Sequence, residues 1–217
     1  MAQKPKLPAA DEKIVRRLLE RYSCPVPYHE VRTRFLGSIA TPLLSVRPLQ
    51  VVSNLWGGEL PEFESMDDAN ELIGALVNGL WNSLTRHQKR TEPFRLTRVI
   101  AGSTRHELGD LALLRRQELD GFVEGLFNGQ ERVDLTRKAS DALDALSDIR
   151  AMMAGIHDMA SDAAKPASAD DLAQTFKHVK ALRLIMEKEI NNVVLDCTRA
   201  RRQMMKDGGS FPPMTLH

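Results

Sequence analysis

The C-terminal half of the chain carries two runs of apolar residues whose spacing alternates between four and three. The first run is Leu135, Ala139, Ala142, Leu146, Ile149, Met153, Ile156 and Ala160. The second run is Leu172, Phe176, Val179, Arg183, Met186, Ile190, Val193 and Cys197. Alternating steps of four and three keep one narrow stripe of a helix facing a partner helix. Because only residues 161–168, which include Pro166, separate the runs, residues 134–206 are predicted to form an antiparallel helical hairpin.

Arg183 interrupts the apolar stripe of the second helix. When the chain is folded back around residue 165, Arg183 comes opposite Ile149, close to Asp148 and Asp144. An arginine at such a place lays its stem on apolar neighbours and turns its guanidinium to a carboxylate. We therefore expect Arg183 at the edge of the hairpin, paired with Asp148 or Asp144, while Leu182 takes its place in the seam.

Helix signals dominate the N-terminal part as well. Apolar periodicity, prolines and capping residues predict helices over about 11–22, 27–40, 48–56, 65–87 and 110–127. Alternating runs rich in Val, Ile and Thr, which are typical of strands, are missing from the sequence. We therefore predict an all-α, multihelical fold. Its parts are an N-terminal helical array over 1–130, the hairpin over 131–206 packed on it, and a frayed tail over 207–217.

Composition places the chain among ordinary globular proteins. Its 217 residues are 42% hydrophobic and 27% charged, with a formal net charge of +1, so disorder and whole-molecule attraction to polyanions are both disfavoured. Cys24 and Cys197 form no Cys-rich framework, which favours a reducing cytoplasm. The N-terminus shows no secretory h-region, and the longest apolar stretch, residues 72–80, is far shorter than the roughly 20 residues that cross a bilayer. We expect no membrane partner.

Two of the predicted helices repeat one pattern, Glu-Leu-x-Gly followed by Gly-Leu-aromatic-Asn, at 71–82 and 118–128. The glycines of this pattern are Gly74, Gly79, Gly121 and Gly125. Each glycine inside a helix costs about 1 kcal/mol relative to alanine, and close approach of another helix is the usual compensation. Because the last two lie one turn apart on one face, we expect helix crossings at these glycines; a ligand or a partner's backbone against the same face is the alternative.

The glycine-rich helix is followed by the pattern Ala-x-x-Ala-Leu-x-x-Leu-x-Asp-Ile at 139–149. Together these features resemble the bacterial YecA/YgfB-like proteins over about residues 66–157. The resemblance implies a multihelical fold without established catalytic residues. Some members of that family add a Cys-rich zinc motif near the C-terminus. Here Cys197 stands alone in that region, so the resemblance implies no metal.

Candidate residues for chemistry are few. His157 and Asp158 lie near the predicted turn and His178 lies on the facing helix, which makes a site of two histidines and one carboxylate the main candidate for metal. Exposed histidines beside acids are common, however, so solvated side chains are the favoured interpretation. Cys24, five residues before His29, is more simply a structural thiol than a nucleophile. We predict no cofactor and name no catalytic residue.

Charge is segregated along the chain. Acidic residues cluster over 59–71. The basic stretches contain Arg86, Lys89, Arg90, Arg95, Arg98, Arg105, Arg115 and Arg116, and then Arg199, Arg201, Arg202 and Lys206. Clusters of this kind are needed for phosphate contacts. With few aromatics and no recognition helix, solvated faces and internal ion pairs are the simpler interpretation.

The function predicted from these patterns is that of a non-enzymatic cytoplasmic interaction or regulatory protein. The alternatives are nucleic-acid binding through the basic stretches at 86–116 and 199–206, and a metal-binding or enzymatic helical protein. A helix over 169–206 is about 57 Å long and its partner over 134–162 about 44 Å. The overhang, with Met204 and Met205, packs either on the N-terminal helices or on a second chain, and a homodimer is slightly favoured.

Overall fold

Helices account for the fold of this protein, which a computed structural model describes for residues 12–207 apart from 101, 103, 163, 165 and 166. No β-strand occurs among these residues, and the predicted all-α class is confirmed. The elements are α1 (Glu12–Arg21), α2 (Tyr28–Ala40), α3 (Pro48–Ser53), η1 (Asn54–Trp56), α4 (Met66–Ile73), η2 (Gly74–Trp81), α5 (Asn82–Leu84), η3 (Thr85–Gln88), α6 (Arg105–Phe127), α7 (Arg137–Ser161) and α8 (Ala169–Asp207). The predicted tail falls, after Asp207, outside the described residues.

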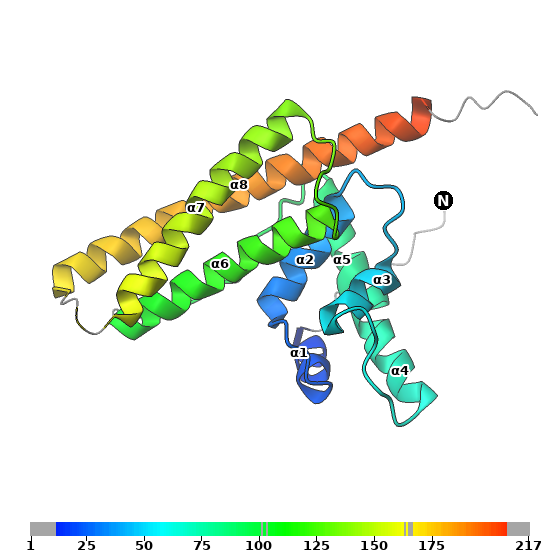
Figure 1. Cartoon of the computed structure of the whole chain (residues 1–217), viewed down its shortest axis with the longest axis horizontal. Helices are drawn as coiled ribbons and strands as arrows, with labels where there is room; N and C mark the ends of the chain where they lie inside the picture. The colour runs from blue at the N-terminus through cyan, green and yellow to red at the C-terminus, as the bar shows by residue number, and fades with distance from the viewer. Residues whose placement is uncertain (1–11, 101, 103, 163, 165–166, 208–217) are drawn as a thin grey trace, which may run out of the picture.

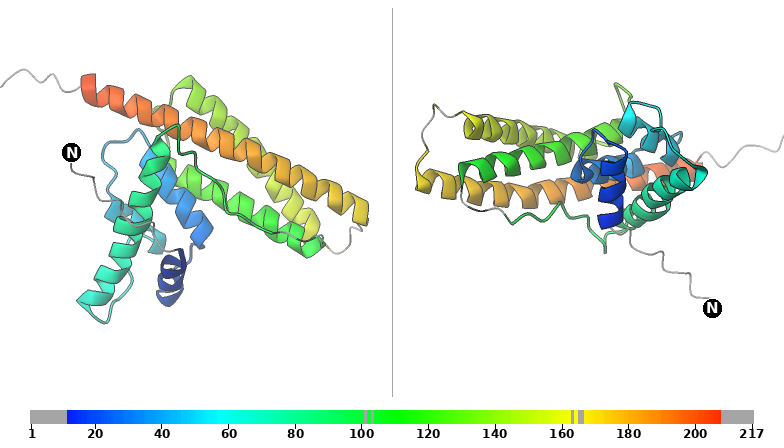
Figure 2. Two further views of the ribbon diagram at one scale, coloured as in Figure 1. Left: turned by 180° about the vertical axis from the view of Figure 1, so that it is seen from behind. Right: turned by 90° about the horizontal axis from the view of Figure 1, so that it is seen from below.

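The three long helices α6, α7 and α8 form one half of the molecule (Figure 1). Helix α7 packs on both α6 and α8, and α2 lies across α6. The shorter helices α1, α3 and α4 gather around α2 in the other half of the molecule, as Figures 1 and 2 show. Helix α6 is therefore the element shared by the N-terminal helices and the C-terminal pair.

The pairing of α7 with α8 confirms the predicted hairpin. Ala139, Leu146 and Met153 of the first run are buried, as are Val179 and Ile190 of the second. Helix α7 begins at Arg137 rather than at about 134, because its N-cap is Thr136, whose side chain accepts a hydrogen bond from the backbone of Ala139. The Thr136 hydroxyl also donates to Asp196 of α8. The 4-3 pattern thus located the seam, while a side-chain contact set the start of the helix.

Helix α8 is much longer than its partner. With 39 residues against 25 it extends over about 58 Å, compared with about 38 Å for α7. Its C-terminal end packs on α2 and η3 of the same chain, and a guanidinium nitrogen of Arg201 donates to the carbonyl of Thr41 at 3.2 Å. This is the first of the two arrangements expected for the overhang. Met204 and Met205 nevertheless remain exposed, and the homodimer stays a prediction.

The expected pairing of Arg183 with Asp148 or Asp144 is wrong. The guanidinium of Arg183 lies 3.8 Å from the Glu187 carboxylate, one turn further along α8, and Asp148 is exposed on α7. Glu187 is only 3% exposed, and Arg95 at 2.7 Å and Arg183 at 3.8 Å together place positive charge beside it, which offsets the loss of its hydration. Leu182 does pack against the core beside Arg183.

Helices α2 and α6 approach each other through glycine on both sides. A Cβ added at Gly121 would lie 2.6 Å from the backbone oxygen of Glu30, and one at Gly125 would lie 2.8 Å from the carbonyl carbon of Arg34. In return, Gly37 of α2 leaves room for the backbone of Leu126, which an added Cβ would approach to 2.7 Å. No side chain is accommodated at any of the three positions, so the close approach explains the glycines at 121 and 125 of α6.

The close approach expected at Gly74 is not present. A Cβ added there would meet nothing within 4 Å. Gly74 begins η2, a π-helix that runs to Trp81 and includes Gly79. Such π-helical segments interrupt α-helices only rarely. The second copy of the glycine pattern therefore marks a change of helix type inside the predicted helix 65–87, and no neighbouring element accounts for its first glycine.

An extended segment, residues 93–97, lies between α6 and α8 and takes its hydrogen bonds from side chains. Asn191 of α8 accepts from the backbone nitrogen of Phe94 at 2.8 Å and donates to its carbonyl at 3.0 Å. Glu187 accepts from the backbone nitrogen of Leu96, and Glu118 of α6 accepts from that of Thr97 at 2.7 Å. These side chains satisfy buried backbone groups that elsewhere pair in a sheet.

His87 makes the stability of the fold depend on pH. The ring is buried against Phe94, with ring centroids 5.3 Å apart, and Nδ1 lies 2.8 Å from the carbonyl oxygen of Glu92. Burial lowers the pKa of His87 below its usual value of 6.5. A lowered folded-state pKa means that the unfolded chain binds the proton more readily. The stability that the neutral ring of His87 contributes is therefore fully present above pH 6.5 and is lost as the pH falls through the lowered pKa.

Urea unfolding between pH 7.5 and pH 5 is expected to show stability falling on acidification, by up to about 1.4 kcal/mol per pH unit from this histidine. His29, whose pKa burial also lowers, adds to the slope. The variant His87→Gln is expected to flatten the dependence, while His178→Gln, on an exposed residue of α8, leaves it as in the wild type. Equal slopes for the wild type and His87→Gln would contradict this assignment.

Candidate functional site

A groove of about 1000 Å³ lies between α6, α7 and the segment that joins them. The two helices are close at the end where His157 Nδ1 of α7 lies 3.1 Å from the carbonyl oxygen of Gly109 of α6. Toward the other end they diverge, as Figure 1 shows. Helix α6 ends at Asn128 and Gly129, both with positive φ (46° and 78°), and residues 130–136 bridge the gap to α7.

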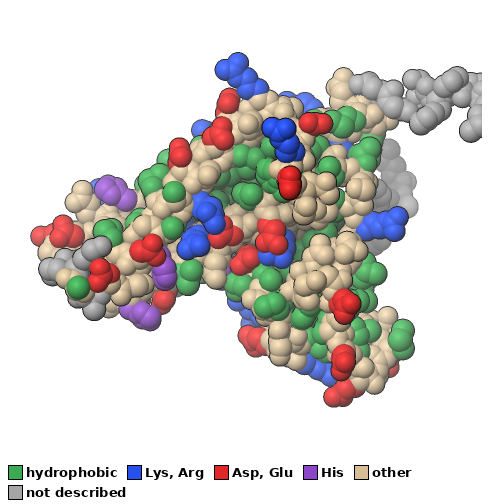
Figure 3. Space-filling model, viewed as in Figure 1, with side chains coloured by type: hydrophobic (Ala, Val, Ile, Leu, Met, Phe, Trp, Pro, Cys, Tyr) green, Lys and Arg blue, Asp and Glu red, His purple; other side chains and the backbone are tan. Residues whose placement is uncertain are grey.

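The floor of the groove is apolar. Leu119 and Leu146 are fully buried beneath it. The half-buried side chains that line it are Val123, Phe127, Val133, Leu135 and Leu143. Figure 3 shows hydrophobic surface in the hollow between α6 and α7, with charged groups along its edges. The groove thus presents apolar surface that no other described part of the chain covers.

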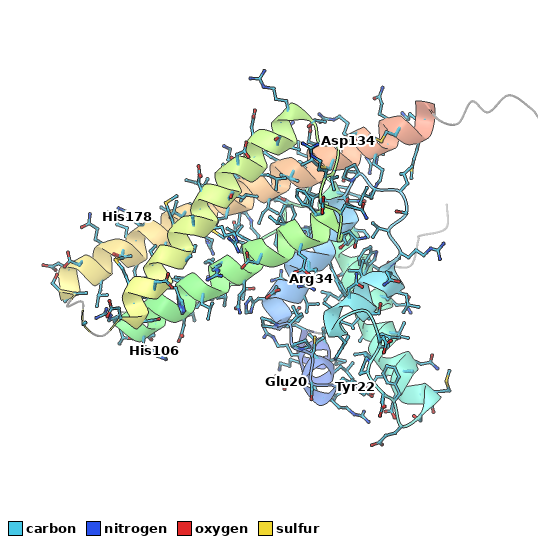
Figure 4. All side chains as sticks on the ribbon, viewed as in Figure 1. Glu20, Tyr22, Arg34, His106, Asp134 and His178 are labelled. Carbon is cyan, nitrogen blue, oxygen red and sulfur yellow. The ribbon has the colours of Figure 1, made fainter. Side chains whose placement is uncertain are left out.

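The rim of the groove is acidic. Five carboxylates line it, against the two arginines Arg132 and Arg150. Asp120 is paired with Arg150, and Glu124 with Arg34. The other three, Glu131, Asp134 and Asp144, are exposed, and in the described part of the chain no basic group lies within 4.0 Å of them. Figure 4 shows Asp134 at the open end of the groove and Arg34 on α2.

The candidate metal residues are not brought together as a site. His157 is half-buried, and its Nδ1 contacts the carbonyl oxygen of Gly109. Asp158 and His178 are exposed. Figure 4 shows His178 on α8 and His106 at the start of α6. Among the described residues no three His, Cys, Asp or Glu side chains are grouped so as to hold a metal ion.

Cys24 and His29 are likewise separate in their contacts. The Nε2 atom of His29 lies 2.9 Å from the side-chain oxygen of Gln117. Burial raises the pKa of the Cys24 thiol above its usual value and raises that of Cys197 to about 12. Because the thiolate is the reactive form, both thiols have the character of structural residues.

The basic stretches divide into two groups. One group serves the fold: Arg115 is buried and paired with Glu118, and Arg105 donates to the carbonyls of Ala160 and Asp162 at the end of α7. Arg201 is held by Thr41. Arg86 and Arg98 are exposed.

The other group gathers along the C-terminal half of α8. One hollow there is lined by Arg90, Arg199, Arg202 and Lys206. The adjoining hollow shares Arg90 and Leu195 with it and adds Lys89, Arg95 and Lys188. These seven cations are called the basic strip below. Residues about 110 positions apart in the sequence therefore form one surface.

Comparison with known proteins adds no relative: no family model, no curated protein and no solved structure matches this chain. The resemblance to YecA/YgfB-like proteins stays a prediction. No helix of the described residues is both long and apolar enough to cross a bilayer.

Sequence reasoning missed the groove altogether. Its floor residues Leu135 and Leu143 belong to or flank the apolar run of α7, and the sequence assigned that run wholly to the hairpin seam. One signal was available: Val123 and Phe127 lie one turn apart on α6, on a different face from Gly121 and Gly125. A helix with apolar residues on one face and close-approach glycines on another has two different neighbours. The apolar face of α6 could therefore have been predicted to lie against something other than the helix at its glycines.

Proposed function

We propose that this protein binds a partner protein by receiving a basic amphipathic helix in the groove between α6 and α7. The observation that carries the proposal is an apolar floor beside three rim carboxylates, which the described residues neither cover nor pair. Amphipathic helices dock into apolar grooves through residues at positions i, i+3, i+4 and i+7. Lysines or arginines flanking those anchors would meet Glu131, Asp134 and Asp144.

The dimensions of the groove support a helix as the occupant. Its lining runs from Ser140 to Arg150 on α7, which corresponds to about 15 Å or nearly three turns. Four anchors from i to i+7 extend over about 10 Å. The volume of about 1000 Å³ is at the top of the range for small-molecule sites, and the groove is open along its outer side (Figure 3), so a small ligand would keep much of its surface in water.

The rest of the molecule accords with a binding role in the cytoplasm. The groove residues reach their places through packing, and the cysteines Cys24 and Cys197 are not bridged, which agrees with a reducing compartment. A helix in the groove would contact α6 on one side and α7 on the other. We infer a scaffold or regulatory protein whose partner is recognised by shape and charge.

Selection from a displayed library of 18-residue peptides tests this proposal. Peptides that bind the wild type are expected to be amphipathic and basic, and fluorescence anisotropy is expected to show binding at least about thirtyfold weaker to Leu143→Glu, which places a charge in the floor. The charge-reversed variant Asp134→Lys/Asp144→Lys, changed only at exposed positions, is expected to bind about tenfold more weakly.

Leu184→Glu is the matched control, because Leu184 is an apolar residue of α8 that is 56% exposed and lies outside the groove. Its affinity for the selected peptides is expected to equal that of the wild type. A selection that enriches no peptide, or peptides that bind all three variants as well as the wild type, would overturn the proposal. Peptides that are apolar but acidic would overturn the charge argument.

A further inference from the structure

The basic strip differs from the other charged surfaces because several of its cations have no carboxylate partner. Arg95 is paired with Glu187 at 2.7 Å and Lys188 with Glu189 at 2.9 Å. Lys89 and Arg199 each have a carboxylate 3.7 Å away. For Arg90, Arg202 and Lys206 the described residues supply no carboxylate within 4.0 Å. The strip thus keeps positive charge that internal ion pairs do not use.

The floor of the strip contains a second feature that points to a ligand site. Thr198, only 2% exposed, lines the hollow with Arg90, Arg199 and Arg202. Its hydroxyl is buried and has no hydrogen-bond partner. Buried hydroxyls are nearly always hydrogen-bonded in folded proteins. Thr198 therefore places an unsatisfied hydroxyl in the wall of this hollow.

The length of the strip indicates a polymer as the ligand. Lys188 and Lys206 are 18 residues apart on one straight helix, which is about 27 Å. Duplex nucleic acid advances about 3.4 Å per base pair, so the strip corresponds to about eight base pairs. A nucleotide or a free phosphate would occupy only one end.

The side chains of the strip indicate contact with the backbone of a duplex and not with unpaired bases. No aromatic residue lines either hollow in the described part of the chain, and binding of single strands depends on aromatic stacking. The exposed amide side chain of Gln203 stands among the cations and suits phosphate and sugar oxygens. A concave strip also suits the convex ridge of a duplex better than a flat bilayer.

We propose that the basic strip binds the phosphate backbone of double-stranded nucleic acid without reading its sequence. Arg90, Arg202 and Lys206 make the primary phosphate contacts, and Arg199 and Lys89 join them when their weak ion pairs at 3.7 Å open. The site is separate from the groove between α6 and α7 and does not depend on the proposed partner helix. With few contacts, affinity is in the range of non-specific binders, about 10⁻⁴–10⁻⁶ M at physiological salt.

The first test titrates the full chain into a fluorescein-labelled duplex of 20 base pairs at several NaCl concentrations between 50 and 300 mM. Fluorescence anisotropy is expected to give saturable binding, equal for two unrelated sequences. A plot of log K against log salt is expected to have a slope between about −3 and −6, from three to seven phosphate contacts. No saturable binding at 50 mM salt, or a slope near zero, would overturn the proposal.

A matched pair of variants locates the site. Arg199→Gln/Arg202→Gln is expected to make the slope shallower by about two and to weaken binding at least about tenfold at 100 mM salt. Lys177→Gln/Lys180→Gln removes the same charge from exposed positions of the same helix outside the strip, and is expected to bind as the wild type does. Equal losses in both variants would mean attraction by charge alone and would overturn the assignment.

Two further measurements distinguish duplex binding by the basic strip from lipid binding and from an effect of the groove. Vesicles containing phosphatidylserine are expected to bind more weakly than the duplex at the same salt, and the reverse order would overturn the choice of ligand. Leu143→Glu, which alters the groove, is expected to leave duplex binding unchanged. Loss of duplex binding in that variant, with circular dichroism showing an intact fold, would contradict the independence of the two sites.

Discussion

Replacing Gly125 by alanine is expected to destabilise the protein by about 3 kcal/mol, at the upper end of the cost of overpacking. The added Cβ would lie 2.8 Å from the carbonyl carbon of Arg34. Backbone atoms in the middle of α2 cannot move aside by a rotamer change, as a side chain could. The gain of about 1 kcal/mol in helix propensity that alanine brings is included in that figure. Urea unfolding followed by circular dichroism measures the change.

Gly155 provides the control for this substitution. It lies within α7, and an added Cβ there meets nothing within 4 Å. Gly155→Ala is therefore expected to stabilise the protein by up to about 1 kcal/mol. The two variants make the same chemical change inside a helix and are predicted to move stability in opposite directions. A Gly125→Ala protein as stable as Gly155→Ala would show that α2 and α6 are not held together at this crossing.

Arg115→Ala is expected to cost about 3–5 kcal/mol, because it leaves Glu118 as a buried charge without its partner. The side chains of Arg115 and Glu118 are 3% and 0% exposed, and Arg115 also donates to the carbonyl of Thr97 at 2.7 Å. The neighbouring residue Arg116 pairs with Asp120 on the same helix, but these side chains are 37% and 29% exposed.

Arg116→Ala is accordingly expected to cost less than about 1 kcal/mol. The adjacent arginines thus compare a buried ion pair with a partly exposed one on the same helix. A double variant, Arg115→Met/Glu118→Leu, is expected to be more stable than Arg115→Ala, because it removes both charges together. Thermal unfolding of the three proteins checks the order, and equal losses for Arg115→Ala and Arg116→Ala would contradict the buried ion pair.

Periodicity in the sequence was sufficient to predict the hairpin of α7 and α8, because a narrow stripe of apolar residues at steps of four and three is buried well by one partner helix. Glycines at 121 and 125 also pointed to a close crossing. Their partner was not predictable, since Gly37 stands alone in α2 and nothing in one sequence links residues about 85 positions apart. Residue spacing within a helix shows which of its faces is packed. Which other element packs on that face depends on the whole fold.

Charged residues were the least predictable part of the molecule. Arg105, Arg115 and Arg90 belong to one basic stretch, yet the first holds the end of α7 and the second is buried. The third lies in the basic strip, where the described residues give it no carboxylate partner. Side-chain type did not distinguish them, because the distinction depends on which helix passes nearby. The groove was missed for a related reason: it arises from the divergence of α6 and α7, and no local pattern records the angle between two helices.

The segment at 93–97 affects the order in which the protein can fold during its synthesis. Its backbone is held by Asn191, which is 97 residues after Phe94, and by Glu187, which is 91 residues after Leu96. At about 5–20 residues per second, a ribosome needs roughly 5 to 20 s to make those partners after the segment itself. At the start of that interval only the elements before the segment, α1 to η3, have been made; α6 and α7 are added during it. Glu118 of α6 can then bind Thr97, but the contacts to Phe94 and Leu96 form only when α8 has been synthesised.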